Sequence, residues 1–256
     1  MKRYLMSLMF MVGLMAFVCS CTSDDKTTVR FSLTDAPSLQ GYQSLYIDVQ
    51  GIQYMVNDSQ FVSLPMTPAI INIFALTNGQ DTLLGNVELN AGERVSQVRL
   101  ILGDNNTLVL KDGTEVSLKV PSGQTSGLKI NIQSDVNLTS GYKVVIDFNA
   151  ESSVVKKGNG SYSLKPVVRG FIEANTSAIF GTILPKNEPM KVFTIQGLDT
   201  IMTVSDTLRN NYFMLNGLKS GTYELKFVDS ADLLRKTISV EVHGGTNNNL
   251  GSVVMD

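Results

Sequence analysis

The sequence has almost none of the residues that build metal centres and disulfide frameworks. Its 256 residues include one histidine, two cysteines and no tryptophan. Cys19 and Cys21 are too few for a disulfide framework or a four-ligand zinc site. A lone histidine, His243, excludes most mechanisms that use histidine as a base or a metal ligand. We therefore expect no cofactor and no catalytic constellation.

Charge is also scarce and nearly balanced. The chain carries 21 Lys and Arg against 23 Asp and Glu, a formal net charge of -2. A nucleic-acid binder needs a clustered basic surface, so we expect no nucleic-acid partner. A hydrophobic share of 43% is typical of a folded chain, and the length suggests one large or two ordinary domains.

The N-terminus reads as a secretion signal. The basic pair Lys2-Arg3 precedes an apolar stretch over residues 4–18, which is shorter than the about 20 residues that a membrane-spanning helix needs. Residues 18–21, V-C-S-C, resemble the lipobox of bacterial lipoproteins. The resemblance implies a signal peptide over 1–20 and an acyl-modified (palmitate-type) Cys21 that anchors the chain to a membrane. Small Ser20 favours Cys21 over Cys19, and ordinary cleavage without a lipid is the alternative.

Residues 21–27 form a short acidic tether. Ser23, Asp24 and Asp25 resemble the export signal that directs Bacteroidetes lipoproteins to the outer face of the outer membrane. The alternative is a solvated spacer, because Ser and Asp are common in flexible leaders. We expect an outer-membrane protein that faces the extracellular side.

After Thr27, apolar and polar residues alternate with a period of two. The inward sets are Val29, Phe31, Leu33; Leu45, Ile47, Val49; Leu128, Ile130, Ile132; Tyr223, Leu225, Phe227; and Ile238, Val240, Val242. Turn sequences such as Asn78-Gly79 separate these runs. No long amphipathic helix appears, and residues 73–76 fit a single helical turn. The pattern predicts an all-β chain with two abutting antiparallel β-sandwich domains.

A polar segment divides the chain in two. One series of strands ends near Arg169, and a new series begins at Ala178 after the polar residues 173–176. The expected domains are residues 28–169 and residues 170–256, the second long enough for a seven-strand sandwich.

Five ordered motifs in the first domain match a known family. They are Leu33-Thr34-Asp35-Ala36-Pro37, Ala91-Gly92 with Val98-Arg99-Leu100, Val120-Pro121-Ser122-Gly123, Asp147-Phe148-Asn149-Ala150 and Leu164-Lys165-Pro166-Val167. This part resembles the Bacteroidetes lipoprotein family with domain of unknown function DUF4382. Asn149 stands where the family pattern has Asp. The resemblance implies architecture and location, and no activity.

The second domain resembles the carboxypeptidase regulatory-like, or transthyretin-like, sandwich. The matching residues are Phe180-Gly181-Thr182-Ile183, the segment from Phe213 to Leu225, and Gly251-Ser252-Val253-Val254. Such modules serve as spacers or as adhesive and recognition domains.

Asp35 and Asp147 are the carboxylates to examine for chemistry. As a pair they would suit a divalent cation or acid–base catalysis. Alternatively, Asp35 caps a turn and Asp147 is a hydrogen-bonded sheet residue. The run Gly103–Asn106, with oxygen ligands in a row, and the run Asn247–Asn249 both fit turns better than calcium loops. No Gly-x-Ser-x-Gly elbow, phosphate loop or dinucleotide fingerprint is present.

Carbohydrate binding by ring stacking depends on exposed aromatic side chains. The candidates are Tyr42, Tyr46, Tyr54 and Tyr162, of which Tyr46 and Tyr54 are expected outside the core. Four Asp-Ser/Thr-apolar tripeptides resemble the Bacteroidetes O-glycosylation acceptor, with acceptors at Thr82, Thr200, Thr207 and Ser230. Ordinary turn chemistry is the alternative for these.

The sequence thus predicts a non-catalytic, lipid-anchored surface protein with a role in adhesion, assembly or scaffolding. Its partner is an unidentified protein or glycan. A glycan-binding accessory lipoprotein and a carboxylate-dependent hydrolase are the alternatives.

Overall fold

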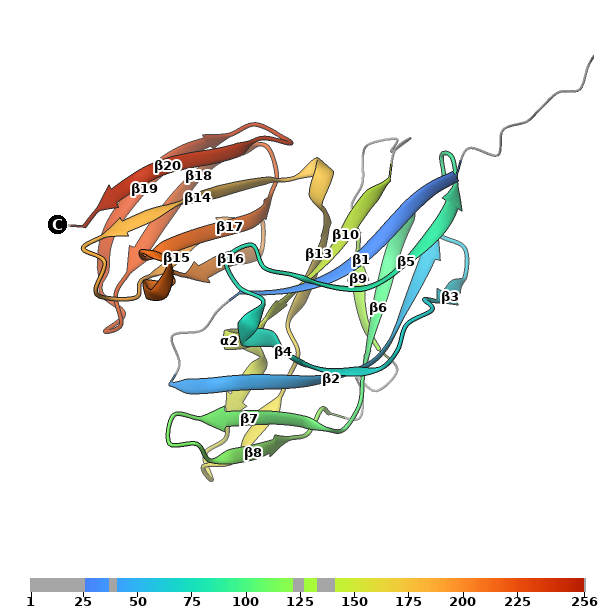
Figure 1. Ribbon diagram of the computed structural model, residues 1–256, viewed down its shortest axis with the longest axis horizontal. Helices are drawn as coiled ribbons and strands as arrows, with labels where there is room; N and C mark the ends of the chain where they lie inside the picture. The colour runs from blue at the N-terminus through green and yellow to red at the C-terminus, as the bar shows by residue number, and fades with distance from the viewer. Residues whose placement is uncertain (1–25, 37–40, 122–126, 133–140, 256) are drawn as a thin grey trace, which may run out of the picture.

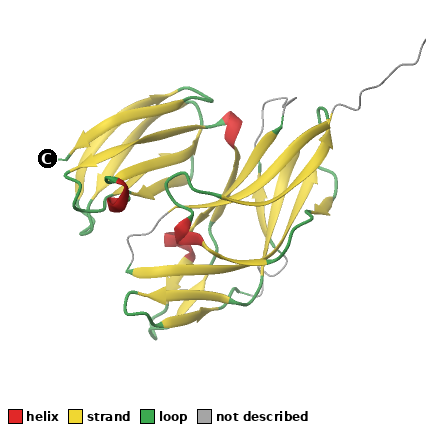
Figure 2. Ribbon diagram, in the orientation of Figure 1, coloured by secondary structure: helices red, strands yellow, loops and turns green. Residues whose placement is uncertain are grey.

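The structure is a computed structural model that describes residues 26–36, 41–121, 127–132 and 141–255. Strands make up most of it, with four helical turns of three or four residues (Figure 2). The strands form two β-sandwiches side by side (Figure 1), which confirms the predicted fold class.

The first sandwich packs two sheets across one apolar core. Sheet 1 has the strand order β13 (Val168–Ile172), β10 (Tyr142–Asn149), β1 (Lys26–Ala36) and β5 (Thr82–Asn90). Sheet 2 contains β8 (Glu115–Leu118), β7 (Asn106–Leu110), β2 (Tyr42–Val56), β6 (Val95–Leu102) and β9 (Leu128–Asn131). Two short strands, β3 (Phe61–Ser63) and β4 (Ala69–Asn72), also pair with β2.

The long strand β2 organises sheet 2. Tyr46 pairs with β4 on one side and with β7 on the other, and Val49 pairs with β4 and β6 in the same way. Strands β6 and β7 therefore lie on the same side of β2, one after the other.

The Gly103–Asn106 segment forms a bulge between β6 and β7, which do not pair with each other but follow one another along β2. The predicted hairpin turn is therefore wrong. Asp48 of β2 fills the gap, where its N–H donates to Asn106 Oδ1 at 3.0 Å and its carboxylate accepts the Asn105 N–H at 3.1 Å. A Cβ at Gly103 would collide with the Asp48 carboxylate, which explains the glycine. Asp48 is only 2% exposed, and these hydrogen bonds offset the cost of burying it.

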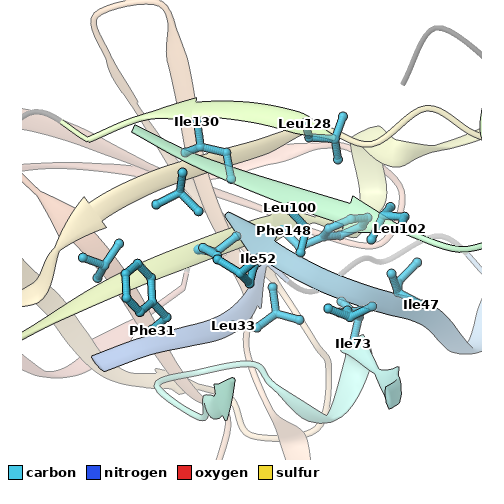
Figure 3. Packing of buried hydrophobic residues seen from close by; sticks show 14 of the residues in the cluster. Phe31, Leu33, Ile47, Ile52, Ile73, Leu100, Leu102, Leu128, Ile130 and Phe148 are labelled. Carbon is cyan, nitrogen blue, oxygen red and sulfur yellow. The ribbon is translucent and has the colours of Figure 1, made fainter. Parts of the chain in front are cut away.

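The core confirms the alternation read from the sequence. Figure 3 shows Phe31, Leu33 and Phe148 of sheet 1 facing Ile47 and Ile52 of sheet 2. Every member of the first two predicted inward sets is fully buried: Val29, Phe31, Leu33, Leu45, Ile47 and Val49.

Short helical turns join the strands of the first sandwich. The 3-10 helix η1 (Ile73–Ala75) confirms the predicted helical turn. The helix α2 (Ala150–Ser153) follows β10, and the Asn149 side chain caps it by accepting the Ser152 N–H at 2.9 Å. A small two-stranded sheet, β11 (Val154–Lys156) with β12 (Tyr162–Leu164), comes next.

The second sandwich has seven strands, the number expected for it. Sheet 3 has the order β17 (Tyr212–Leu218), β14 (Ser177–Leu184) and β20 (Asn247–Val254). Sheet 4 has the order β16 (Asp199–Val204), β15 (Lys191–Gln196), β18 (Gly221–Val228) and β19 (Leu234–Val242). The 3-10 helix η4 (Thr207–Arg209) leads from sheet 4 to sheet 3.

The sequence predicted antiparallel sheets, but not every pair of strands in them is antiparallel. One parallel pair occurs in each sandwich, β1 with β10 and β14 with β20. Both pairs join strands that are far apart in the chain, and parallel pairing requires such a long crossover. Asn247–Asn249 are the first residues of β20 rather than the expected turn, because pairing with β14 supplies their backbone partners.

The boundary between the sandwiches lies a few residues beyond position 169. Strand β13 pairs with β10, so residues up to Ile172 belong to the first sandwich. The 3-10 helix η3 (Glu173–Asn175) connects it to β14. The polar residues 173–176 lie in this connection, and β13 carries too little apolar alternation to reveal its partner.

The predicted inward-facing residues of β18 are also confirmed. Tyr223, Leu225 and Phe227 are 7%, 0% and 0% exposed and belong to the second core. Glu224, between them, is exposed, and Lys226 is half-buried.

Candidate functional site

Asp35 and Asp147 lie on neighbouring strands but on opposite faces of sheet 1. The register pairs Thr34 with Asp147, and Asp35 with Phe148. Paired residues share a face and successive residues alternate, so Asp35 lies on the core face and Asp147 on the outer face. The two carboxylates do not form the pair that a cation or acid–base catalysis would need.

Asp35 instead supports the start of α2. One carboxylate oxygen accepts the Ala150 N–H at 3.0 Å, and the side chain is 5% exposed. This bond joins the end of β1 to the chain leaving β10.

Asp147 holds an arginine that reaches into the second sandwich. Arg169 donates from Nε to Asp147 at 2.7 Å, and its Nη2 forms an ion pair with the same oxygen at 2.6 Å. The guanidinium also donates to the main-chain oxygens of Asn216 at 2.7 Å and Gly217 at 3.3 Å. The carboxylate thus orients a cation that binds the backbone of β17.

Asn78 makes a second bridge between the sandwiches. Its Nδ2 donates to Val204 O at 2.9 Å, and its Oδ1 accepts from Thr203 Oγ1 at 2.8 Å and from Met214 N at 3.1 Å. Asn78 adopts a left-handed backbone conformation with φ of 53° and is 6% exposed. Asparagine tolerates this conformation, and its amide both donates and accepts.

Together Arg169 and Asn78 form hydrogen bonds with main-chain groups at the edges of two strands. Val204 belongs to the edge strand β16, while Met214, Asn216 and Gly217 belong to the edge strand β17. Side chains of the first sandwich occupy places that another strand would otherwise take. The junction is therefore specific and polar.

A cleft of about 290 Å³ opens at this junction. Both sandwiches line it: Thr34, Gln80, Asp81 and Phe171 come from the first, and Met214, Asn216 and Asn247 from the second. Junctions between domains are frequent places for ligands.

An ion triad stands at one side of the cleft. Lys143 Nζ lies 2.7 Å from an oxygen of Asp81 and 2.7 Å from an oxygen of Glu173. Burial alone would lower the pKa of Lys143, but the hydrogen bonds and charges of the two carboxylates outweigh it and raise the pKa. The lysine therefore stays protonated and holds both carboxylates in place.

A second groove, of about 220 Å³, also lies at the junction. Its lining includes Val167, Arg169 and Met202, and the tip of the β15–β16 hairpin contributes Leu198. The Leu198 side chain is fully exposed.

The tyrosines do not form a stacking platform. Tyr42 and Tyr162 are half-buried, and their rings meet edge to face with centroids 6.0 Å apart. Tyr46 is half-buried, whereas Tyr54 packs in the first core, so its expected position outside the core is wrong. The β2 alternation passes from Ile52 directly to Tyr54, which accounts for its burial.

Several predicted residues bear on location and modification rather than on the junction. Cys21, Ser23, Asp24 and Asp25 lie outside the described residues. Of the glycosylation candidates, Thr200, Thr207 and Ser230 are exposed and Thr82 is half-buried. His243 is exposed at the end of β19.

The described residues include neither a membrane-spanning helix nor a cluster of metal-ligating side chains. No helix in this part of the chain is long and apolar enough to span a membrane. No three side chains of His, Cys, Asp or Glu in it lie close enough to hold a metal ion together.

The sequence did not reveal the residues that build the junction. Asn78-Gly79 signals a turn, but nothing local indicates that the asparagine bridges to strands more than a hundred positions away. Arg169 likewise has no partner nearby in sequence. The one signal was Asp147 itself, a carboxylate on the outer face of the mostly apolar strand β10.

The fold and the junction define a two-domain β-sandwich protein, and a family match covers its first part. The family described as domain of unknown function (DUF4382) matches residues 26–166, more than half of the chain. The chain therefore belongs to this family. The match ends before the second sandwich, so the transthyretin-like resemblance stays a prediction.

No curated protein matches the chain. Solved structures with some likeness include the Bacillus anthracis TIE protein, which is 8% identical with a TM-score of 0.25 and matches 90% of this chain over 34% of its own. BcpA, the major pilin subunit of Bacillus cereus, is 10% identical with a TM-score of 0.24, covering 90% and 70%. A putative adhesin from Bacteroides ovatus is 7% identical with a TM-score of 0.23, covering 90% and 92%.

These scores limit what the likeness means. All three TM-scores are far below 0.5, so the likeness carries no argument about function. The chain spans about a third of the TIE protein's length.

Proposed function

We propose that this protein is a lipid-anchored lipoprotein of the outer membrane, displayed on the cell surface, with a role in adhesion, assembly or scaffolding. The observation that carries the location is the short apolar leader followed by V-C-S-C at residues 18–21. Attachment through Cys21 is stable when the modified cysteine carries two or three acyl chains.

The arrangement of the two sandwiches supports a role in display. The chain from Cys21 to Lys26 spans at most about 18 Å even when fully extended, which would hold the start of β1 near the membrane. Strand β1 begins there, and Thr34 near its other end lines the junction cleft, so the second sandwich lies beyond the far end of β1 (Figure 1). The second sandwich would thus be the part presented to a partner.

Free strand edges support assembly by strand addition. Within the described residues no strand pairs with the outer side of β19 or β20. An exposed edge can accept an extended segment of a partner through main-chain hydrogen bonds.

Replacement of Cys21 tests the anchor. We expect Cys21→Ala to lose radiolabelled palmitate and to move from the detergent phase to the aqueous phase. Cys19→Ala is the matched control and should keep both properties. Retention of the lipid in Cys21→Ala would contradict the assignment.

The acidic tether has its own test. Replacing Asp24 and Asp25 with Ala should keep the lipid but protect the protein from protease added to intact cells. Equal digestion of the two versions would mean that the segment is only a spacer.

O-glycosylation is a further proposal for the second sandwich. Thr207 and Ser230 are exposed, and each follows an aspartate whose side chain accepts main-chain N–H groups of the same turn. Intact-mass spectrometry of protein from the native cell should show glycan mass that Thr207→Ala and Ser230→Ala reduce. An unmodified mass would refute the proposal.

A further inference from the structure

We propose that the junction cleft binds a neutral polyhydroxylated ligand of one or two sugar units. The proposal deepens the surface role above and rests on it for its biological setting. Binding itself depends only on the folded chain and is measured separately from anchoring.

The position and size of the cleft favour a small ligand. Its volume of about 290 Å³ lies just below the range for pockets that hold drug-sized molecules, about 300–1,000 Å³, which suits a smaller ligand. Its walls come from both sandwiches, so Asn78 and Arg169 fix their separation before any ligand arrives. Such preorganisation lowers the entropic cost of binding.

Amide side chains on both walls have hydrogen-bonding capacity to spare. Gln80 of the first sandwich and Asn216 of the second have no side-chain hydrogen bond to any described residue. Asn247 Oδ1 accepts the Ala178 N–H at 3.2 Å, which leaves its Nδ2 group available among the described residues. A side-chain amide donates and accepts at once, as does the hydroxyl group of a sugar.

The ion triad supplies fixed acceptors and sets the charge preference. Lys143 holds the carboxylates of Asp81 and Glu173, each at 2.7 Å, so two anions flank one cation. Carboxylate oxygens that face the cleft can accept hydrogen bonds from ligand hydroxyls, and charge assistance strengthens such bonds. The net negative charge repels a phosphate or a uronic acid.

Apolar groups line part of the same cleft. Phe171, Val145 and Met214 are among the residues that line it. Phe171 is 8% exposed, so only a small part of it is open to a ligand, enough to meet the C–H face of a sugar ring rather than to hold an apolar molecule. An apolar ligand would also leave the amides and carboxylates desolvated without partners.

The experiment measures binding of simple sugars to the purified protein. Saturation-transfer NMR and calorimetry are run with methyl mannoside, methyl galactoside and N-acetylglucosamine, and with glucuronic acid as the anionic comparator. We expect saturable binding of at least one neutral sugar and weaker binding of glucuronic acid. No saturable binding of any of the three neutral sugars at millimolar concentration would overturn the proposal.

Variants locate the site. Asn216→Ala should weaken binding by about three- to tenfold, the effect of losing one or two hydrogen bonds. The control is Asn86→Ala, an exposed residue of β5 outside the cleft, which should bind as the original does. Equal affinity of the Asn216 and Asn86 variants would refute the site.

A charge variant tests the preference. Glu173→Gln keeps the size of an exposed side chain and removes one negative charge, so it should narrow the preference for neutral over anionic sugar. An unchanged preference would remove the triad from the proposal. Failure of all three tests would leave the membrane anchor intact, because palmitate labelling of Cys21 is read independently.

Discussion

The second sandwich meets the first along the edge strands β16 and β17, whereas no described strand pairs with the outer side of its other two edge strands, β19 and β20. On the closed side, Asn78 and Arg169 bind the backbone of β16 and β17 directly. On the open side, features of β19 and β20 themselves limit pairing with other strands. The closed edges depend on another domain, and the open edges depend on their own sequence.

The open edges use two devices that discourage unwanted pairing. Strand β19 carries the charged residues Arg235, Lys236 and Glu241. Strand β20 contains Gly251 with φ of 64°, and its register with β14 shifts there. The Lys236 ammonium also donates to Val254 O at 2.7 Å. The edge of β20 is bulged but carries no charged residue, so it remains open to a suitable partner strand.

The largest effect on stability is expected in the core of the second sandwich, which its closed and open edges share. Leu225→Ala should lower the free energy of unfolding of the second sandwich by about 2–5 kcal/mol, because the fully buried side chain leaves a cavity. Lys226→Ala, on the opposite face, should change it by no more than about 0.5 kcal/mol. Thermal and denaturant melts measure both, and equal costs would refute the facing.

A separate core also predicts independent folding. Residues 176–256 contain the whole second cluster of buried apolar residues and should melt cooperatively when expressed alone. We expect a lower midpoint than in the full chain, because β16 and β17 lose their partners. A fragment without a cooperative transition would mean that the closed side is essential for folding.

Asn78→Gly removes one of the two bridges on the closed side. Glycine keeps the left-handed backbone accessible, so the loss of three hydrogen bonds should cost about 2–3 kcal/mol. Asn210→Gly is the matched control, since Asn210 is exposed and has φ of 57°. Chemical denaturation should separate the two variants. Similar small costs would show that the junction is held by other contacts.

The Lys143 triad predicts a dependence on pH at the cleft. The pKa of Lys143 is raised above 10.5 in the folded state, so its contribution is present below that value and is lost as pH rises through the raised pKa. Because the side chain is 24% exposed, we expect at most about 1 kcal/mol. The difference in stability between the original and Lys143→Met should therefore shrink as the pH rises above 10.5. A constant difference would contradict the ion pairing.

The smallest effect belongs to the open side. Lys236→Ala removes one exposed cap on Val254 O and should cost no more than about 0.5 kcal/mol. The same denaturation series as for Asn78 gives the value. A cost equal to that of Asn78→Gly would erase the contrast between closed and open edges.

Much of the fold followed from the sequence because it depends on local alternation. Val29, Phe31 and Leu33 face one core, and Tyr223, Leu225 and Phe227 face the other, as a period of two requires. The single helical turn near Ile73 was equally local. By contrast, the run Gly103–Asn106 has the composition of a turn. It is a bulge because β6 and β7 both pair with the same side of β2, which the sequence does not show.

The junction shows what a linear sequence does not contain. The sequence by itself determined the strand faces and the division into two series of strands, because each depends on residues within a few positions of one another. Only the tertiary structure decided that Asp35 and Asp147 point apart, because that depends on the register of β1 with β10. It also decided that Asn78 and Arg169 close the edges of another domain and thereby form the cleft. Hydrogen bonds between residues far apart in the chain follow from how whole sheets pack, and local pattern carries no record of that packing.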